Sequence, residues 1–225
     1  IIDTDGHSGD AGTKTRIESF LHSVRQDRAH EQYPASHNKR LTNFKEKEGN
    51  SYGMDQIRSR DETVLIPYMG PNSEIFAATL ATVNVAAEAL PMATSETLKI
   101  GRRHTSGKEC LPLSVTLGSF LARLQQEKSN SNKRYALFMP TANGPCRFGQ
   151  YNIMDKLILE RLGLQNHVGI WAPLDEDYLA GLPGGFSILL FAAFASMDMI
   201  MAGLLDVWPQ ENKPGLARHI YKKYK

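Results

Sequence analysis

Four short apolar segments alternate with helix-length segments along most of the chain, and this alternation constrains the fold more than any other feature. The apolar segments lie at residues 63–67, 85–90, 135–140 and 167–173. Helical spacing of apolar residues marks the intervals at about 72–83, 95–103, 111–124 and 151–162. Strands joined through helices require crossover connections, which favour parallel pairing and helices on both faces of a sheet. The sequence therefore predicts an α/β fold with a mostly parallel sheet and flanking helices.

The first 60 residues differ from this pattern. They contain four of the seven histidines and ten Lys or Arg, but few aliphatic residues. One helix is expected around residues 17–24, where apolar residues recur at helical spacing, and a polar linker is expected over residues 30–60. The histidine spacing matches no metal-binding signature. We therefore expect a polar arm at residues 1–60 and one α/β domain at residues 61–225.

The overall composition excludes several classes of protein. Lys and Arg number 26 against 24 Asp and Glu, a formal net charge of +2, which is too balanced for a nucleic-acid binder. Two cysteines in 225 residues do not make a disulfide-stapled secreted fold, so a reducing cytoplasm is expected. The chain opens at Ile1 with neither an initiator Met nor a signal sequence, which suggests a piece of a longer polypeptide.

The longest apolar stretch runs from Phe186 to Trp208. Two carboxylates, Asp198 and Asp206, and two serines interrupt it, so we expect a buried helix and not a membrane span. The methionines of this stretch, Met197, Met199 and Met201, are expected to fill the core.

Both cysteines occupy positions where ligands bind in sheets of this kind. Ligands bind outside the carboxyl ends of parallel strands. Cys146 comes just after the third strand segment and at a helix start, and Cys110 follows a loop and precedes another helix start. A helix N-terminus carries free N–H groups and partial positive charge, which favour the thiolate that binds metal. The sequence therefore predicts that Cys110 and Cys146 converge at this edge as metal ligands.

The flanking residues are polar and support this hypothesis. Lys108 and Arg147 would stabilise thiolates or an anionic cluster. The backbone at Asn143 and Gly144 could donate hydrogen bonds to the sulfur atoms.

Other interpretations remain open at this point. The cysteines could be inert, or could form a redox disulfide if their Cα atoms lie within about 7 Å. Zinc would also bind thiolates, although the close-spaced cysteine pairs of structural zinc sites are missing. No nucleotide-binding or serine-hydrolase motif is present, and the loops at 175–177 and 181–185 are best explained as an acidic loop and a turn.

Three motifs together carry a family resemblance. Leu65-Ile66-Pro67-Tyr68-Met69-Gly70-Pro71, Gly107-Lys108-Glu109-Cys110-Leu111-Pro112 and the run from Met139 to Tyr151 resemble the dehydratase-like module of 2-hydroxyacyl-CoA dehydratase activase-related proteins. The resemblance covers roughly residues 62–210, and the stretch Asp10–Glu18 is similar to the connecting region of those chains.

The resemblance implies a Rossmann-like α/β module that binds a 4Fe–4S cluster through Cys110 and Cys146. It further implies activase-type ATPase modules of the same or a partner chain as partners, an acyl-CoA substrate, and a role in electron transfer or in radical 2-hydroxyacyl-CoA dehydration, a lyase reaction. No membrane partner is implied. One departure is that the dehydratase subunits use three cysteines per cluster, whereas this chain has two. The alternative is a non-catalytic interaction domain of a multidomain protein with unligated thiols.

Overall fold

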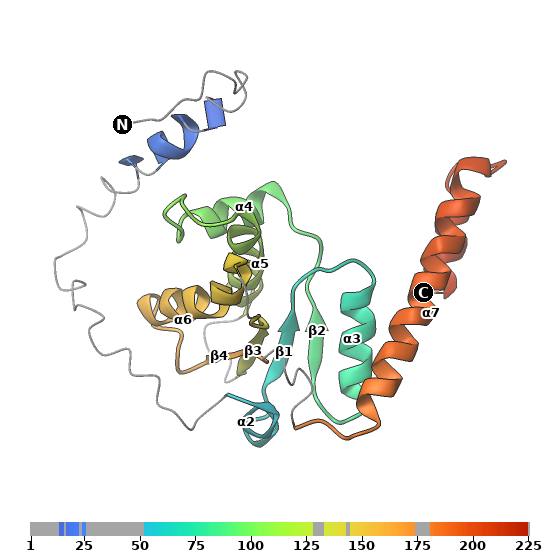
Figure 1. Cartoon of the computed structure of the whole chain (residues 1–225), viewed down its shortest axis with the longest axis horizontal. Coiled ribbons are helices and arrows are strands. Elements are labelled where there is room, and N and C mark those ends of the chain that lie inside the picture. The colour runs from blue at the N-terminus through green and yellow to red at the C-terminus, as the bar shows by residue number, and fades with distance from the viewer. Residues whose placement is uncertain are drawn as a thin grey trace. The chain divides into compact units, whose positions relative to one another are not determined.

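The computed structural model describes residues 14–15, 17–22, 24–25, 52–127, 133–142, 145–173 and 181–224 (Figure 1). The chain divides into two compact units. We call residues 1–51 with 93–128 the helical unit, and residues 52–92 with 129–225 the sheet unit. Each is described by itself.

The sheet unit is built on four parallel strands. They are β1 (Thr63–Ile66), β2 (Ala87–Ala89), β3 (Tyr135–Phe138) and β4 (Val168–Trp171), in the order β2-β1-β3-β4. Every strand pair is parallel, with Val64 opposite Ala87, Thr63 opposite Tyr135, and Tyr135 opposite Val168. The predicted α/β fold with a parallel sheet is confirmed.

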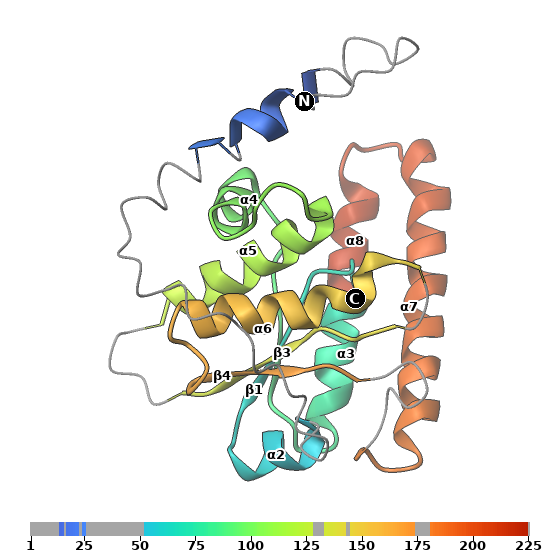
Figure 2. The same ribbon diagram turned by 60° about the vertical axis from the view of Figure 1, so that its left-hand side comes forward.

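Two crossover helices leave the central strands in opposite directions. Helix α3 (Asn72–Ala81) joins β1 to β2, whereas α6 (Tyr151–Arg161) joins β3 to β4. Because crossovers are right-handed, opposite directions place the two helices on opposite faces of the sheet, as Figures 1 and 2 show. The crossovers therefore add strands in opposite directions on either side of the boundary between β1 and β3. The carboxyl ends of the strands at such a boundary are where open α/β sheets bind ligands.

Aromatic side chains fill the space between α3 and its face of the sheet. The ring centroids of Phe76 and Phe138 lie 5.0 Å apart, and those of Phe138 and Trp171 also lie 5.0 Å apart. Alternate residues of β1 and β3 point to this side, and their neighbours Leu65 and Leu137 are also fully buried. Burial on both faces explains why β1 and β3 are nearly continuous apolar runs.

A short helix lies inside the segment expected to be a polar linker. Helix α2 (Met54–Ser59) begins at Gly53, whose N–H donates to Oε1 of Gln56 at 3.0 Å. Met54 and Ile57 are 1% exposed and belong to the core of the sheet unit. Six residues are too few to show helical periodicity, which is why the sequence pattern did not reveal α2.

Helix α7 (Phe186–Val207) overturns one expectation. We predicted a buried helix, but only Phe186, Leu190 and Met197 are buried on it. Among the described residues, Phe186–Gln210 is the one helix long and apolar enough to cross a membrane by length and composition, and 11% of its most apolar window is buried. Met199, expected in the core, is 77% exposed. The helix packs through one narrow face. It follows the last strand and does not connect two strands of the sheet.

The sheet unit ends in a turn and a basic helix that the sequence analysis did not identify. A 3-10 turn, η3 (Trp208–Gln210), leads to α8 (Leu216–Tyr224). Glu211 accepts hydrogen bonds from the N–H groups of Gly215 at 2.6 Å and Ala217 at 2.9 Å. These bonds hold the pKa of Glu211 below its ordinary value. Glu211 thus anchors the start of α8.

The helical unit contains α4 (Ser95–Arg102) and α5 (Leu111–Gln125), both near their predicted positions. Thr94 caps α4 by accepting a hydrogen bond from the N–H of Thr97. The two helices cross at glycines. A Cβ atom on Gly101 would lie 1.8 Å from the backbone oxygen of Ser114, and one on Gly118 would lie 1.9 Å from that of Thr97. Only glycine permits this approach of one helix backbone to the other.

Candidate functional site

Cys146 lies on the loop after β3, one of the two central strands. It is exposed and is the N-terminal cap of a 3-10 turn, η2 (Arg147–Gln150), that runs directly into α6. Its extended backbone, with φ −73° and ψ 128°, directs the chain into the turn without a side-chain capping bond. The thiol is therefore free at the carboxyl edge of the sheet, next to the β1–β3 boundary at which the direction of the crossovers changes.

The loop that carries Cys146 folds back on the end of β3. The N–H of Thr141 donates to the carbonyl of Pro173 at 3.1 Å, which extends the β3–β4 pairing. The hydroxyl of Thr141 donates to the carbonyl of Gly149 at 2.9 Å, and a Cβ atom on Gly149 would lie 2.3 Å from the oxygen of Ala142. Glycine at 149 therefore lets the start of the loop contact its end, which fixes where Cys146 emerges.

The other central strand, β1, ends in a loop held by a buried serine. Oγ of Ser73 accepts a hydrogen bond from the N–H of Met69 at 2.5 Å and donates to the carbonyl of Pro67 at 3.0 Å. Gly70 takes φ 72°, a conformation that favours glycine. Tyr68 and Met69 are 44% and 47% exposed. This loop presents an aromatic and a thioether side chain at the same edge as the Cys146 loop.

Cys110 has an equivalent local setting in the helical unit. It is partly buried, free, and caps the N-terminus of α5 with an extended backbone. The preceding turn is anchored by Glu109, whose Oε1 accepts hydrogen bonds from the N–H and the hydroxyl of Ser106 at 3.1 and 2.9 Å. Burial favours the neutral form of Glu109, but hydrogen bonds from Ser106 and Gly107 outweigh it and hold the pKa of this carboxyl below its ordinary value.

The remaining predicted site residues have varied placements. Lys108 and Arg147 are exposed, each within two residues of a cysteine in the sequence. Asn143 and Gly144 lie outside the described residues, as does the acidic loop at 175–177.

The two cysteines belong to different units, Cys110 to the helical unit and Cys146 to the sheet unit. Their convergence at one metal site stays a prediction. Both thiols are free, so no disulfide joins them. Across the part of the chain that the structure describes, no group of three or more His, Cys, Asp or Glu side chains could hold a metal ion.

Helix α6 contains a titratable residue that our sequence analysis did not single out. Asp155 is 0% exposed, and neither carboxylate oxygen has a hydrogen-bond partner within the described part of the chain. Burial raises the pKa of Asp155 to about 8. It lies four residues after Tyr151 and three before Ile158, both buried, so helical spacing could have revealed an acid on the inward face.

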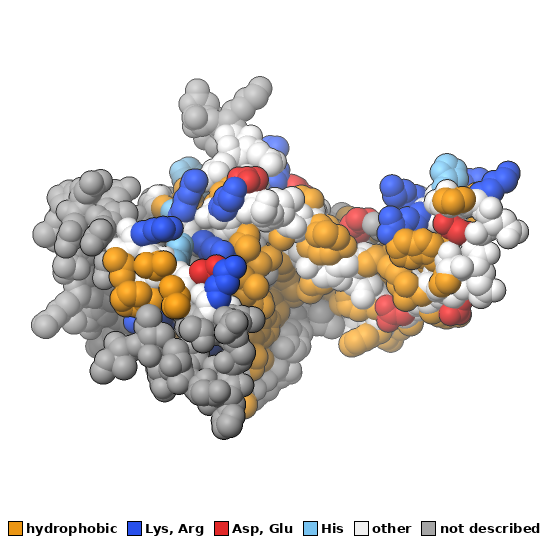
Figure 3. All heavy atoms as spheres, turned by 90° about the horizontal axis from the view of Figure 1, so that it is seen from above, with side chains coloured by type: hydrophobic (Ala, Val, Ile, Leu, Met, Phe, Trp, Pro, Cys, Tyr) orange, Lys and Arg blue, Asp and Glu red, His pale blue; other side chains and the backbone are white. Residues whose placement is uncertain are grey.

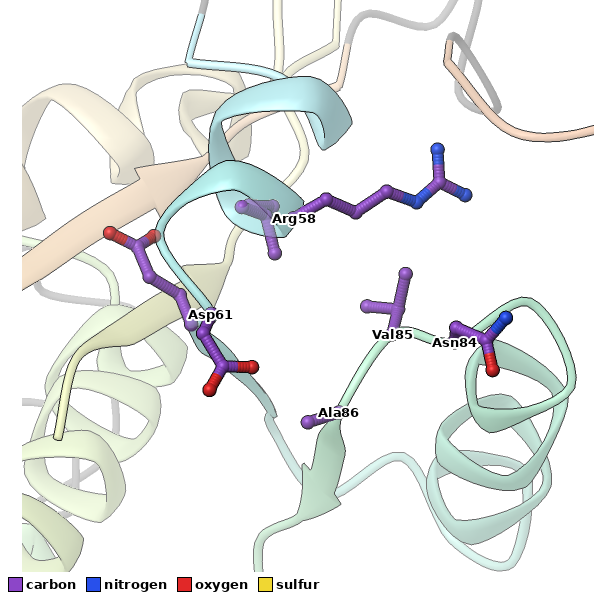
Figure 4. A pocket seen from close by; sticks show the side chains of 7 residues that line it. Arg58, Asp61, Asn84, Val85 and Ala86 are labelled. Carbon is purple, nitrogen blue, oxygen red and sulfur yellow. The ribbon is translucent and has the colours of Figure 1, made fainter.

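A cavity of about 180 Å³ lies at the opposite, amino edge of the sheet (Figure 4). Asp61 and Asn84 line it, and both take left-handed backbone conformations at helix-to-strand turns. Arg58 also lines it, but its Nη1 already donates to the carbonyl of Gly181 at 2.9 Å. Because ligand pockets usually exceed about 300 Å³, we interpret this cavity as a gap between two turns.

No protein-family model matches the chain, and comparisons with curated proteins and with solved structures also find no match.

Proposed function

We propose that the chain is an iron–sulfur module related to radical 2-hydroxyacyl-CoA dehydratases and their activase-linked proteins, with Cys146 as its principal ligand. The supporting observation is the position of Cys146: an exposed free thiol at a helix start, directly after a central strand of a parallel sheet. This is the edge where such sheets bind ligands. The resemblance of the motifs around both cysteines supports the same assignment.

The residues of the chain do not complete the ordinary ligand set of a 4Fe–4S cluster. Such a cluster takes four thiolates, and the sequence contains two cysteines. Among the described residues, no cluster of three or more His, Cys, Asp or Glu side chains could supply the remaining ligands. We therefore propose a partial cluster site. This chain contributes Cys146 and Cys110, and another polypeptide segment contributes the remaining thiolates.

Several wider assignments belong to the same proposal. The sheet unit would be a Rossmann-like half-domain, preceded by a polar arm over residues 1–60. Activase-type ATPase modules of the same or a partner chain would be its partners, an acyl-CoA its substrate, and the cytoplasm its compartment. Lys108, Arg147 and the backbone at Asn143 and Gly144 would stabilise negative charge on the cluster.

The test is anaerobic isolation of the chain together with the polypeptide that supplies the remaining thiolates, followed by iron and sulfide analysis. We expect bound iron with visible absorbance in the unmodified chain, and loss of both in Cys146→Ala. Cys110→Ala reports whether the second thiol ligates the same metal. Ser187→Ala, far along the chain on α7, is a control that should keep the iron. Iron-free protein, or absorbance equal in the unmodified chain and Cys146→Ala, would contradict the proposal.

A second candidate is a non-catalytic interaction domain with unligated thiols. The observation that favours it is the exposed apolar surface of α7, which is unusual for an isolated soluble domain. Iron-free protein in the same experiment would support this candidate.

A further inference from the structure

Helix α7 exposes large apolar side chains along most of its length. Ile188, Phe191 and Met199 are 75%, 67% and 77% exposed. In Figure 1 the helix stands at the right-hand side of the view, and Figure 3 shows hydrophobic side chains at the surface of that end. Soluble chains rarely leave so large an apolar surface uncovered, so this surface is expected to bind something.

Within the sheet unit, the inner face of α7 is already occupied. Phe186, Leu190 and Met197 form its buried face, and the ring of Phe194 lies 6.5 Å from that of Phe76 on α3. The hydroxyl of Tyr221 on α8 lies 3.8 Å from the sulfur of Met197, so α8 lies on the same side. The described residues of the sheet unit leave the opposite face uncovered.

That opposite face has the spacing of a helix–helix contact. Its residues recur at alternating intervals of four and three, all are exposed, and they are Ile188, Ala192, Ala195, Met199, Ala202 and Asp206. Apolar residues at this spacing form a straight seam that packs against a second helix. Three alanines in the seam allow the partner helix to approach closely.

We propose that this seam pairs with α7 of a second copy of the chain, in antiparallel orientation. The positions of the six seam residues are symmetric about residue 197. A two-fold axis at that point therefore places Ala192 opposite Ala202 and Ala195 opposite Met199, small against small and small against large. This self-complementarity is what a two-fold symmetric interface requires.

The charges on α7 agree with the antiparallel pairing. Asp206 comes opposite Ile188 in the first turn of the other α7, where helix N–H groups lack intrahelical acceptors and carry partial positive charge. Asp198 lies about 100° around the helix from Met199, at the side of the seam, and can stay in water.

A lipid surface fits the seam less well. Both charged residues of α7 are acidic, so anionic headgroups would repel them, and the basic residues Arg218, Lys222 and Lys223 lie on α8. The seam is also rich in alanine, whereas helices that bind membrane surfaces present larger apolar side chains. The observations favour a second copy.

Sedimentation velocity over a range of concentrations tests the proposal. We expect the chain to sediment as a dimer, and Met199→Arg to weaken dimerisation by at least about 100-fold, because each dimer would bury two unpaired charges at its centre. Leu205→Arg is a matched control on the same helix: Leu205 is 56% exposed but lies off the seam. The control should remain dimeric.

A monomeric unmodified chain, or equal weakening by both arginine variants, would overturn the proposal. Flotation with vesicles of mixed neutral and anionic lipids tests the competing partner. Binding of the monomer to vesicles that is lost in Met199→Arg would assign the surface to lipid instead.

Cross-linking tests the orientation in a chain whose two native cysteines are replaced by serine. Mild oxidation of an equimolar mixture of Ala195→Cys and Met199→Cys chains should give a covalent heterodimer. Preferential cross-linking of Ala195→Cys to itself would indicate parallel pairing and overturn the antiparallel arrangement. The outcome does not depend on iron, so it can fail or succeed separately from the proposed function.

Discussion

Helices α6 and α7 reverse the usual relation between polarity and burial. Helix α6 carries Asp155, which is fully buried without a hydrogen-bond partner among the described residues, whereas α7 leaves Ile188 and Met199 more than two-thirds exposed. The difference follows from connectivity. Helix α6 joins the adjacent parallel strands β3 and β4, so a right-handed crossover must press it against the sheet. Helix α7 follows the last strand and is under no such constraint.

The comparison shows that topology, more than the hydropathy of a helix, decides which residues are buried here. It predicts that changing the polarity of single residues on the two helices will affect stability in opposite ways. Removing the ionisable group from the inward face of α6 should stabilise the fold at pH values where that group is charged, and removing apolar atoms from exposed positions of α7 outside the proposed seam should cost little.

The largest expected effect is the pH dependence caused by Asp155. Its pKa rises from the ordinary 3.8 to about 8 in the folded chain, so the folded state binds more protons than the unfolded state between these values. The contribution of Asp155 to stability should therefore be greatest below about pH 4 and decrease as pH rises to 8, by roughly 5 kcal/mol at about 1.4 kcal/mol per pH unit. Asp155→Asn should abolish this part of the slope in urea unfolding.

The control for this prediction is Glu160→Gln, an exposed carboxyl on the same helix. Its pH profile should match that of the unmodified chain. Parallel profiles for the unmodified chain and Asp155→Asn would show that Asp155 is solvated or paired in solution.

The second effect compares two adjacent leucines on α7. Leu190 is 7% exposed and Leu189 is 45% exposed. Leu190→Ala should lower the free energy of unfolding by about 3 kcal/mol, because it leaves a cavity between α7 and the core. Leu189→Ala should lower it by less than about 1 kcal/mol. Urea denaturation measures both, and equal losses would mean that Leu189, which lies about 100° around the helix from the seam residue Ile188, is also buried in solution.

The smallest effect concerns a second buried acid, Glu62, which differs from Asp155 in having a partner. Nε of Arg134 donates to Oε1 of Glu62 at 3.3 Å. Burial raises the pKa of Glu62, and Arg134 opposes that rise. Arg134→Met should cost about 1 kcal/mol at pH 7, a modest value because Arg134 is 38% exposed and its charge is screened.

The sign of the pH dependence checks this third prediction. Without Arg134, the pKa of Glu62 should rise further above 4.5, so the deficit of Arg134→Met should grow as pH increases from 4 to 7. A deficit that is constant with pH would mean that Arg134 acts by packing alone.

Most of the sheet unit could be predicted from local pattern. The central strands β1 and β3 are apolar on both faces and the crossover helices show helical spacing, so these elements can be identified from their own residues. The position of Cys146 after the third strand followed from the same pattern, whereas the central place of that strand in the sheet did not.

Features that depend on contacts between distant residues could not be predicted. The exposure of α7 is one such feature, because it depends on which elements the helix connects and not on its own sequence. Helix α2 is too short to show a period, although Met54 and Ile57 are core residues. The division that separates Cys110 from Cys146 arises because residues 93–128 form a unit with the N-terminal segment, which no local pattern records.

The β1–β3 pairing has a consequence for the order of folding. Thr63 pairs with Tyr135 across α3, β2, α4 and α5, whereas β1–β2 and β3–β4 each pair across a single helix. Loop-closure entropy makes the distant pairing the slowest to form. During synthesis, the β1–α3–β2 segment would emerge first and expose the inner edge of β1 until β3 arrives. That edge is where a nascent chain would pair wrongly with a neighbour, and chaperone binding there would protect it.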